Sequence, residues 1–353
     1  MTAVQTERVL APGPVRAVRR GLRRRRVLVG AVLLGLLAVV LVASLALGDV
    51  RLSPGDVVAS LTGRGTRASD FIVHGLRLPR VLTGLAVGFA FGMAGAVFQT
   101  MLRNPLASPD IIGITSGASA AAVLALLLLH LSGTAVAGFA FGGALVTALA
   151  IYLLAWRQGV SGHRLVLVGI GVAAVLHSVV NFLMTRAEIY EAQLALVWLT
   201  GSLNGASADR LRPLLVVLVL AVLLSRWAGR ALEGLQLGDD SARGLGVSVE
   251  RTRLLLILFA VALAAVATSA AGPVGFVAFV SAPVARRLTG DAGAGLLTAG
   301  LVGAAVVTLA DLTAQHALPV ELPVGVLTAA VGAPYLIWLL LRTPTTAGSA
   351  GRR

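Results

Sequence analysis

The sequence contains no cysteine and no lysine, so that all 29 of its basic side chains are arginine. The missing cysteine excludes a disulfide, a thiolate nucleophile and a Cys-ligated metal, and the missing lysine excludes a P-loop lysine and a Schiff base. Charged residues are also scarce, at 12% of the 353 residues, which is about half of their share in soluble domains. This scarcity, with 57% hydrophobic residues and a mean hydropathy of +0.92, indicates a polytopic membrane protein.

Ten apolar segments are candidates for crossing a membrane, for which a helix needs about 20 residues. The first, Val27–Gly48, is too long for a typical signal peptide, so we expect it to be retained. Gly272-Pro273 divides the run Leu254–Ala285 into two spans, because both residues break helices. The stretch Ala192–Asn204 is too short to span and is interpreted as an interfacial or re-entrant piece. The other spans are predicted at Val81–Leu102, at two helices within Ile111–Trp156 separated near Leu131–Thr134, and at Leu165–Thr185, Leu211–Gly229, Ala292–Ala310 and Leu322–Leu341.

The spans define one transmembrane domain, residues 27–342, between a basic tail (1–26) and a C-terminal tail (343–353), with a polar loop at 229–253. If the N-terminus is cytoplasmic, 21 arginines lie in inner segments and 8 in outer ones. This bias follows the positive-inside rule, so the sequence predicts a multi-pass protein of the cell membrane with both termini cytoplasmic. Topology and attraction to anionic membrane lipids explain the tail arginines, and no nucleic-acid partner is expected.

The predicted spans contain almost no ionisable side chains, whereas proton- or sodium-coupled carriers usually keep some in mid-membrane. Asp311 and Glu321 fall at the outer ends of two spans, where water can solvate them. His177 and Asn181 share one helix face, and an interhelical hydrogen bond explains this pair better than a substrate contact. No two histidines have the spacing of metal ligands, and no metal site is predicted. Glycines at spacings of three and four in one span predict close helix packing: Gly84, Gly88, Gly92 and Gly95.

The polar loop has an unusual centre. Gly238 followed by Asp239 and Asp240 resembles a helix start, with carboxylates at the positive end of the helix dipole, and Gly244 and Gly246 would end this short helix. The local pattern leaves two interpretations open, a docking element for a partner protein and a solvated connector.

Several motifs in a fixed order carry a family resemblance. They are Leu76–Leu82 with Gly92–Gln99, Asn104–Pro109, Ile112-Gly113, Ser116–Ala118, Leu237–Gly246, Ala271–Val277, Ala285-Arg286, Glu321–Thr328 and Gly332–Pro334. Over residues 50–342 the sequence resembles the FecCD-type permeases, the membrane subunits of binding-protein-dependent ABC importers for ferric siderophores, haem and cobalamin. The resemblance implies an all-α polytopic membrane protein of about ten transmembrane helices with the type II ABC importer permease fold, and no catalytic activity.

The resemblance also implies roles for individual residues. Arg77 and Arg80 match outer basic positions that dock the binding protein, while Gln315 and His316 stand where a further basic residue is common. Ala282-Pro283 replaces the Pro-His or Pro-Gln of the family, which displaces the proline by one position. The inner loop matches the segment that couples the permease to its ATPase, with Gly238, Asp239, Asp240, Ala242, Arg243, Leu245 and Gly246 at its centre. Polar residues expected along the translocation path are Gln99, Asn104, Ser116 and Asn181.

The implied complex contains a second permease, two ATPase subunits that bind ATP and Mg, and an extracytoplasmic siderophore-binding protein; this chain binds no cofactor itself. The segment Ala195–Gly205 looks more like permeases for enterobactin-type catecholate siderophores than like those for cobalamin. Such systems commonly pair two different permeases, so a heterodimer is expected. Cobalamin or haem import by the same machinery is the alternative, and an ion-coupled secondary carrier is an alternative of a different class.

Overall fold

The computed structural model describes residues 12–48, 50–157, 162–290, 293, 295–317 and 320–342, and every regular element in these ranges is a helix. The first eleven residues and the predicted C-terminal tail lie outside the described residues. The helices are α1 (Pro12–Ala46), α2 (Pro54–Leu61), α3 (Arg67–Asp70), the π-helix η1 (Phe71–Arg77), α4 (Leu78–Met101), α5 (Ile114–Leu127), α6 (Thr134–Ala155), α7 (Gly162–Met184), α8 (Ile189–Thr200), α9 (Ala208–Gln236), α10 (Asp239–Gly244), α11 (Val249–Ala271), α12 (Val277–Thr289), α13 (Leu296–His316) and α14 (Val324–Arg342).

Each of the ten predicted spans coincides with a helix. Within the described ranges seven helices are long and apolar enough to cross a membrane: Arg20–Ala46, Arg67–Met101, Thr134–Ala155, Gly162–Met184, Ala208–Gln236, Val249–Ala271 and Leu296–His316. The other three predicted spans correspond to α5, α12 and α14, which have 14, 13 and 19 residues. Helix α8 has 12 residues, which confirms that the segment around it is too short to span.

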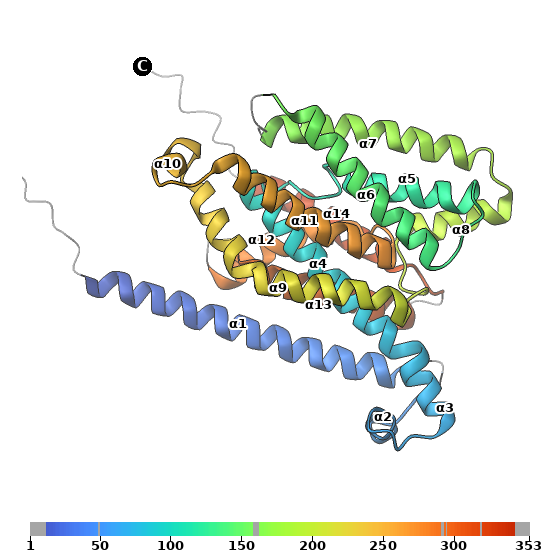
Figure 1. The fold of residues 1–353 in the computed structure, drawn as a ribbon. Coiled ribbons are helices and arrows are strands. Elements are labelled where there is room, and N and C mark those ends of the chain that lie inside the picture. The colour runs from blue at the N-terminus through green and yellow to red at the C-terminus, as the bar shows by residue number, and fades with distance from the viewer. Residues whose placement is uncertain are drawn as a thin grey trace, which may run out of the picture.

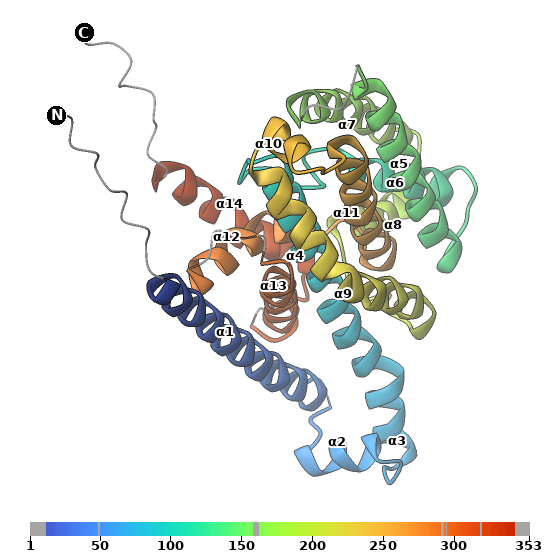
Figure 2. The same ribbon diagram turned by 60° about the vertical axis from the view of Figure 1, so that its left-hand side comes forward.

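Helices α4 and α11 lie at the centre of the bundle, with α5–α8 on one side (Figure 1). On the other side are α12–α14 and α1, as the turned view shows (Figure 2). Helix α4 packs against α11, α12 and α13. The beginning of α1, the end of α14 and α10 lie at one end of the bundle, whereas α2 and α3 lie at the opposite end (Figures 1 and 2). The two ends carry the two candidate sites described below.

The glycine stripe of α4 is a packing surface, as its spacing predicts. A Cβ atom on Gly88 or Gly92 would collide with the backbone of α13 at Gly303 and Ala299, and one on Gly95 would collide with the backbone of α12. Only hydrogen atoms fit between these backbones, so glycine is required for the helices to approach this closely. The stripe therefore determines how α12 and α13 sit on the central helix.

The predicted break at Gly272-Pro273 is present. Helix α11 ends at Ala271, and Gly272 follows it with a positive φ of 74°, which glycine adopts without steric cost. The chain then turns into α12, whose N-cap Phe276 also has a positive φ, of 65°. Across this turn the amide of Ser202 donates to the carbonyl of Ala271 at 2.8 Å, so the segment after α8 is joined to the α11–α12 turn.

The basic tail is helical from Pro12 onward, which differs from the predicted start of the first helix at Val27. Arginine is a good helix former, so the apolar span extends backward without a break. Arg25 also reaches the end of α12: its Nε donates to the carbonyl of Leu288 at 2.8 Å and its Nη2 to that of Arg287 at 3.2 Å. The last carbonyls of a helix have no partner within it, so this contact stabilises the end of α12.

Candidate functional site

The predicted short helix in the polar loop is present as α10, Asp239–Gly244. Its N-cap Gly238 has a φ of 101° and Gly246 a φ of 82°, so glycines in the left-handed region bound it on both sides. Ala242 is completely buried, and its carbonyl accepts from the amide of Val247 at 2.9 Å, which folds the loop back on itself. The loop is thus a defined structural unit, which projects from one end of the bundle (Figure 1).

Ion pairs fix the orientation of α10. Arg253 of α11 donates to both carboxylate oxygens of Asp239 at 3.1 Å, which ties the first residue of α10 to the following helix. Within α10 Arg243 pairs with Asp240 at 3.1 Å. Leu245 is exposed to 70% beside these charges. A rigid projection that combines charges with an exposed apolar side chain has the features of a protein-docking element.

Arg103 supports the same region from the segment between α4 and α5. Its Nη2 donates to the carbonyl of Leu235 at 2.7 Å, close to the end of α9. Helix α9 runs seven residues beyond the predicted span end, so the loop before α10 is shorter than the sequence indicates. Helix α10 is thus held between α9, which Arg103 contacts, and α11, to which Arg253 ties it.

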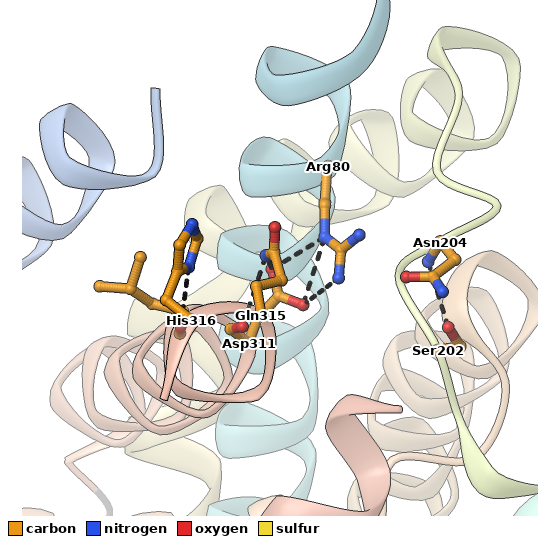
Figure 3. A network of polar contacts seen from close by, with 7 residues as sticks. Arg80, Ser202, Asn204, Asp311, Gln315 and His316 are labelled. Atoms are coloured by element: carbon orange, nitrogen blue, oxygen red, sulfur yellow. Dashed lines mark hydrogen bonds and ion pairs between the residues drawn. The ribbon is translucent and has the colours of Figure 1, made fainter. Parts of the chain in front are cut away.

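At the opposite end of the bundle Arg80 forms an ion pair inside the chain. Its Nη2 lies 2.9 Å from Oδ1 of Asp311, and its Nε donates to both carboxylate oxygens, at 3.3 and 3.1 Å (Figure 3). Gln315 donates to Oδ2 of the same carboxylate at 2.7 Å. The expectation that water solvates Asp311 is wrong: α13 continues to His316, and the Asp311 residue is only 5% exposed.

Arg77 also contacts the chain itself. Its Nη1 donates to the carbonyl of Leu45 at 2.7 Å and its Nη2 to that of Val50 at 2.6 Å, so this guanidinium holds the segment after α1. Arg77 and Arg80 line one cavity of about 370 Å³, together with Asn204 from the loop after α8 and His316 from the end of α13. The structure therefore brings the two predicted docking arginines together, and each has an intramolecular partner.

Gln99 links α4 to α12. Its Nε2 donates to the carbonyl of Phe279 at 2.9 Å, and its Oε1 accepts from Nη2 of Arg286 at 2.8 Å. Within a helix the carbonyl of Phe279 would accept from the amide of residue 283, but Pro283 has no N–H. Gln99 therefore satisfies the carbonyl that the displaced proline leaves without a partner, and its 3% exposure is typical of such an internal bridge.

The four predicted path residues do not form one cluster. Asn104 is exposed in the segment after α4, where its Oδ1 accepts from the amide of Leu106 at 2.9 Å. Ser116 is buried near the start of α5 and lies 3.4 Å from Nε2 of His177 on α7. Asn181 is exposed one turn further along α7. Their role in a translocation path stays a prediction.

Asp110 is a partly buried acidic group in the segment between α4 and α5. Burial raises the pKa of its carboxyl to about 6, which a hydrogen bond from Thr115 partly offsets.

In the part of the chain that the structure describes, no group of three or more His, Asp or Glu residues could hold a metal ion.

A profile of the FecCD transport family matches residues 36–342. The chain belongs to the FecCD transport family. It is 43% identical over 296 residues to the ferric enterobactin transport system permease protein FepG of Escherichia coli (strain K12), which covers 84% of this chain and 90% of that protein. It is also 43% identical over 324 residues to the achromobactin transport system permease protein CbrC of Dickeya dadantii (strain 3937), which covers 89% of this chain and 92% of that protein.

The fold is similar to a solved structure described as an inward-facing conformation of a putative metal-chelate type ABC transporter. The TM-score is 0.77 at 28% identity, over 90% of this chain and 100% of that chain. The predicted family and the all-α polytopic fold are therefore confirmed. The protein is a multi-pass permease of the cell membrane, a transport subunit of an ABC transporter without catalytic activity or a cofactor of its own.

Sequence reasoning missed the partners of several predicted site residues. Arg253 and Asp239 are separated by 14 positions, and Arg80 and Asp311 by 231, so no local periodicity connects them. One signal in the sequence does point to such a partner: an acid within a long apolar segment, as Asp311 is, usually has a buried partner.

Proposed function

We propose that this permease imports a ferric siderophore, of the catecholate type, into the cytoplasm. Membership of the FecCD transport family and the likeness to a metal-chelate type transporter support import of a metal chelate. The similarity to an enterobactin permease supports a catecholate, but an achromobactin permease is 43% identical as well. Cobalamin and haem are the alternative substrates.

The observation that carries the proposed mechanism is the braced helix α10 at one end of the bundle. In the proposal α10 sits in a cleft of the ATPase, and its residues Asp239–Gly246 form the contact. ATP binding and hydrolysis in the ATPase move α10, and the ion pair between Arg253 and Asp239 transmits the movement to α11. The permease then alternates between inward and outward access.

The other end of the bundle is the proposed docking face for the binding protein. The cavity that holds Arg77 and Arg80 lies near α2 and α3, away from α10. With α10 in the cytoplasm this face is extracytoplasmic, and both termini are then cytoplasmic, as the arginine distribution predicts. The complete transporter has a second permease, proposed to be a different chain, and two ATPase subunits.

Uptake by the reconstituted transporter tests the proposed substrate and the energy source. Proteoliposomes that contain both permeases, the ATPase subunits and the binding protein should take up a ferric catecholate only with ATP, and in preference to cobalamin and haem. Preferred uptake of cobalamin or haem would overturn the substrate. Uptake driven by an ion gradient without the ATPase subunits would overturn the ABC mechanism.

The coupling role has its own test. Arg253→Gln removes the tie between α10 and α11, so the ATPase should no longer respond to the loaded binding protein. Arg251→Gln is the matched control, since it removes one exposed arginine two residues away. Equal coupling in both variants would contradict a role for the Arg253 tie.

A further inference from the structure

An open cavity of about 670 Å³ lies between α1, α9 and α13. Helix α13 packs against both α1 and α9, and its first residues line the cavity. Its volume is within the range of about 300–1,000 Å³ found for small-molecule sites. The cavity is far from the docking arginines, and neither the family nor the proposed mechanism gives it a role.

The charged residues of the cavity favour an anion. Arg26 of α1 and Arg226 and Arg230 of α9 line it, against one carboxylate, that of Glu233. Among the residues that the structure describes, Arg226 and Arg230 form no ion pair, and both are exposed. Guanidinium groups bind phosphate well, because their planar N–H groups match two phosphate oxygens at once.

The cavity lies where the polar and apolar parts of all three helices meet. On α1 it takes in Arg26 and then Val27, the first residue of a long apolar stretch. On α9 the apolar stretch ends just before Arg226, and α13 begins with the apolar Leu296. Such a level is the membrane interface, at the end of the bundle that carries α10 (Figure 1).

We propose that this cavity binds the phosphate headgroup of an anionic phospholipid. The arginines hold the phosphate. The acyl chains lie along the apolar side chains of α1 and α13, of which Val27 and Leu301 line the cavity itself. Free phosphate would gain the charge interactions without the apolar contacts, so the lipid is the better fit. The lipid bridges α1 to α9, the helix that leads into α10.

Native mass spectrometry of the purified transporter complex tests the site. The complex is titrated with phosphatidylglycerol, and with phosphatidylcholine of the same acyl chains as the neutral reference. Each arginine near a membrane surface contributes about 1 kcal/mol, a factor of about five. The double variant Arg226→Gln/Arg230→Gln should therefore bind phosphatidylglycerol about 25-fold more weakly, while binding of phosphatidylcholine should not change.

Two further variants separate the site from general charge and from misfolding. Arg186→Gln/Arg212→Gln removes two exposed arginines at the opposite end of the bundle and should bind phosphatidylglycerol like the wild type. Arg226→Lys/Arg230→Lys keeps the charge and should retain most of the binding.

Three results would overturn the proposal. The first is wild-type binding of phosphatidylglycerol by the Arg226→Gln/Arg230→Gln variant. The second is the same loss of binding in this variant and in the Arg186→Gln/Arg212→Gln control, which would mean that net charge rather than the cavity attracts the lipid. The third is displacement of the lipid by excess inorganic phosphate, which would identify the site as one for the free anion.

Discussion

The ion pair between Arg80 and Asp311 joins the beginning of α4 to the C-terminal half of α13, and its two ends should respond differently to mutation. The Arg80 side chain is 20% exposed at the edge of a cavity, whereas the Asp311 side chain is 8% exposed. Arg80→Gln leaves a buried carboxylate with only Gln315 as a partner. Asp311→Asn leaves a guanidinium that can turn toward water in the cavity.

The magnitude follows from this difference in burial. Removing one partner of a buried ion pair costs about 3–5 kcal/mol, because the other charge stays buried without compensation. We expect Arg80→Gln to lower the free energy of unfolding by about 3 kcal/mol, the low end of that range, since Gln315 still donates to the carboxylate. For Asp311→Asn we expect about 1–2 kcal/mol, because the partly exposed Arg80 guanidinium loses its hydrogen-bond acceptor but can be solvated in the cavity.

A double-mutant cycle measures this coupling. The free energy of unfolding is determined by titrating the purified permease with a denaturing detergent, for the wild type, Arg80→Gln, Asp311→Asn and the double variant. In the double variant no charge is left unpaired, so it should be more stable than Arg80→Gln alone. If the two single effects simply add, the ion pair contributes nothing and the reasoning is refuted.

The same variants distinguish a docking role of Arg80 from a purely structural one. If Arg80 binds a carboxylate of the binding protein, Asp311→Asn frees the guanidinium and association should be retained or strengthened, while Arg80→Gln weakens it. If Arg80 only holds α4 against α13, both variants should weaken association in proportion to their loss of stability. The second result would remove Arg80 from the proposed docking face.

Three other predictions follow from particular contacts. Gly88→Ala puts a Cβ against the backbone of α13 and should destabilise the permease by about 1–3 kcal/mol, whereas Gly142→Ala, whose Cβ meets open space, should be neutral or stabilising in the same unfolding assay. Gln99→Leu leaves the buried carbonyl of Phe279 without a donor, which should lower the free energy of unfolding by about 1–3 kcal/mol. Gln99→Met should lower it by the same amount. Burial raises the pKa of Asp110 from 3.8 to about 6, so the native state loses stability as the pH rises through this range. Asp110→Asn should therefore be more stable than the wild type by up to about 3 kcal/mol at pH 7.5, and by less at pH 4.5; an equal difference at both pH values would contradict the raised pKa.

Local patterns predicted the elements of the fold well, since each depends on residues close together in the chain. The apolar runs mark the helices, Gly272-Pro273 marks the turn between α11 and α12, and the glycines around Asp239 mark the ends of α10. Helix ends were less accurate. Arginine continues α1 into the basic tail, and α9 and α13 run beyond their apolar stretches, because a helix does not stop where its side chains become polar.

By itself the sequence determined that this is a membrane permease of the FecCD transport family, with a short helix between α9 and α11 and a glycine face on α4. Only the tertiary structure decided what the polar residues do. Asp311 became the partner of Arg80, and Gln99 the donor to the carbonyl that Pro283 leaves free. The physical reason is that a buried polar group must find a partner. That partner lies wherever helix packing brings it, at a separation that no local pattern encodes.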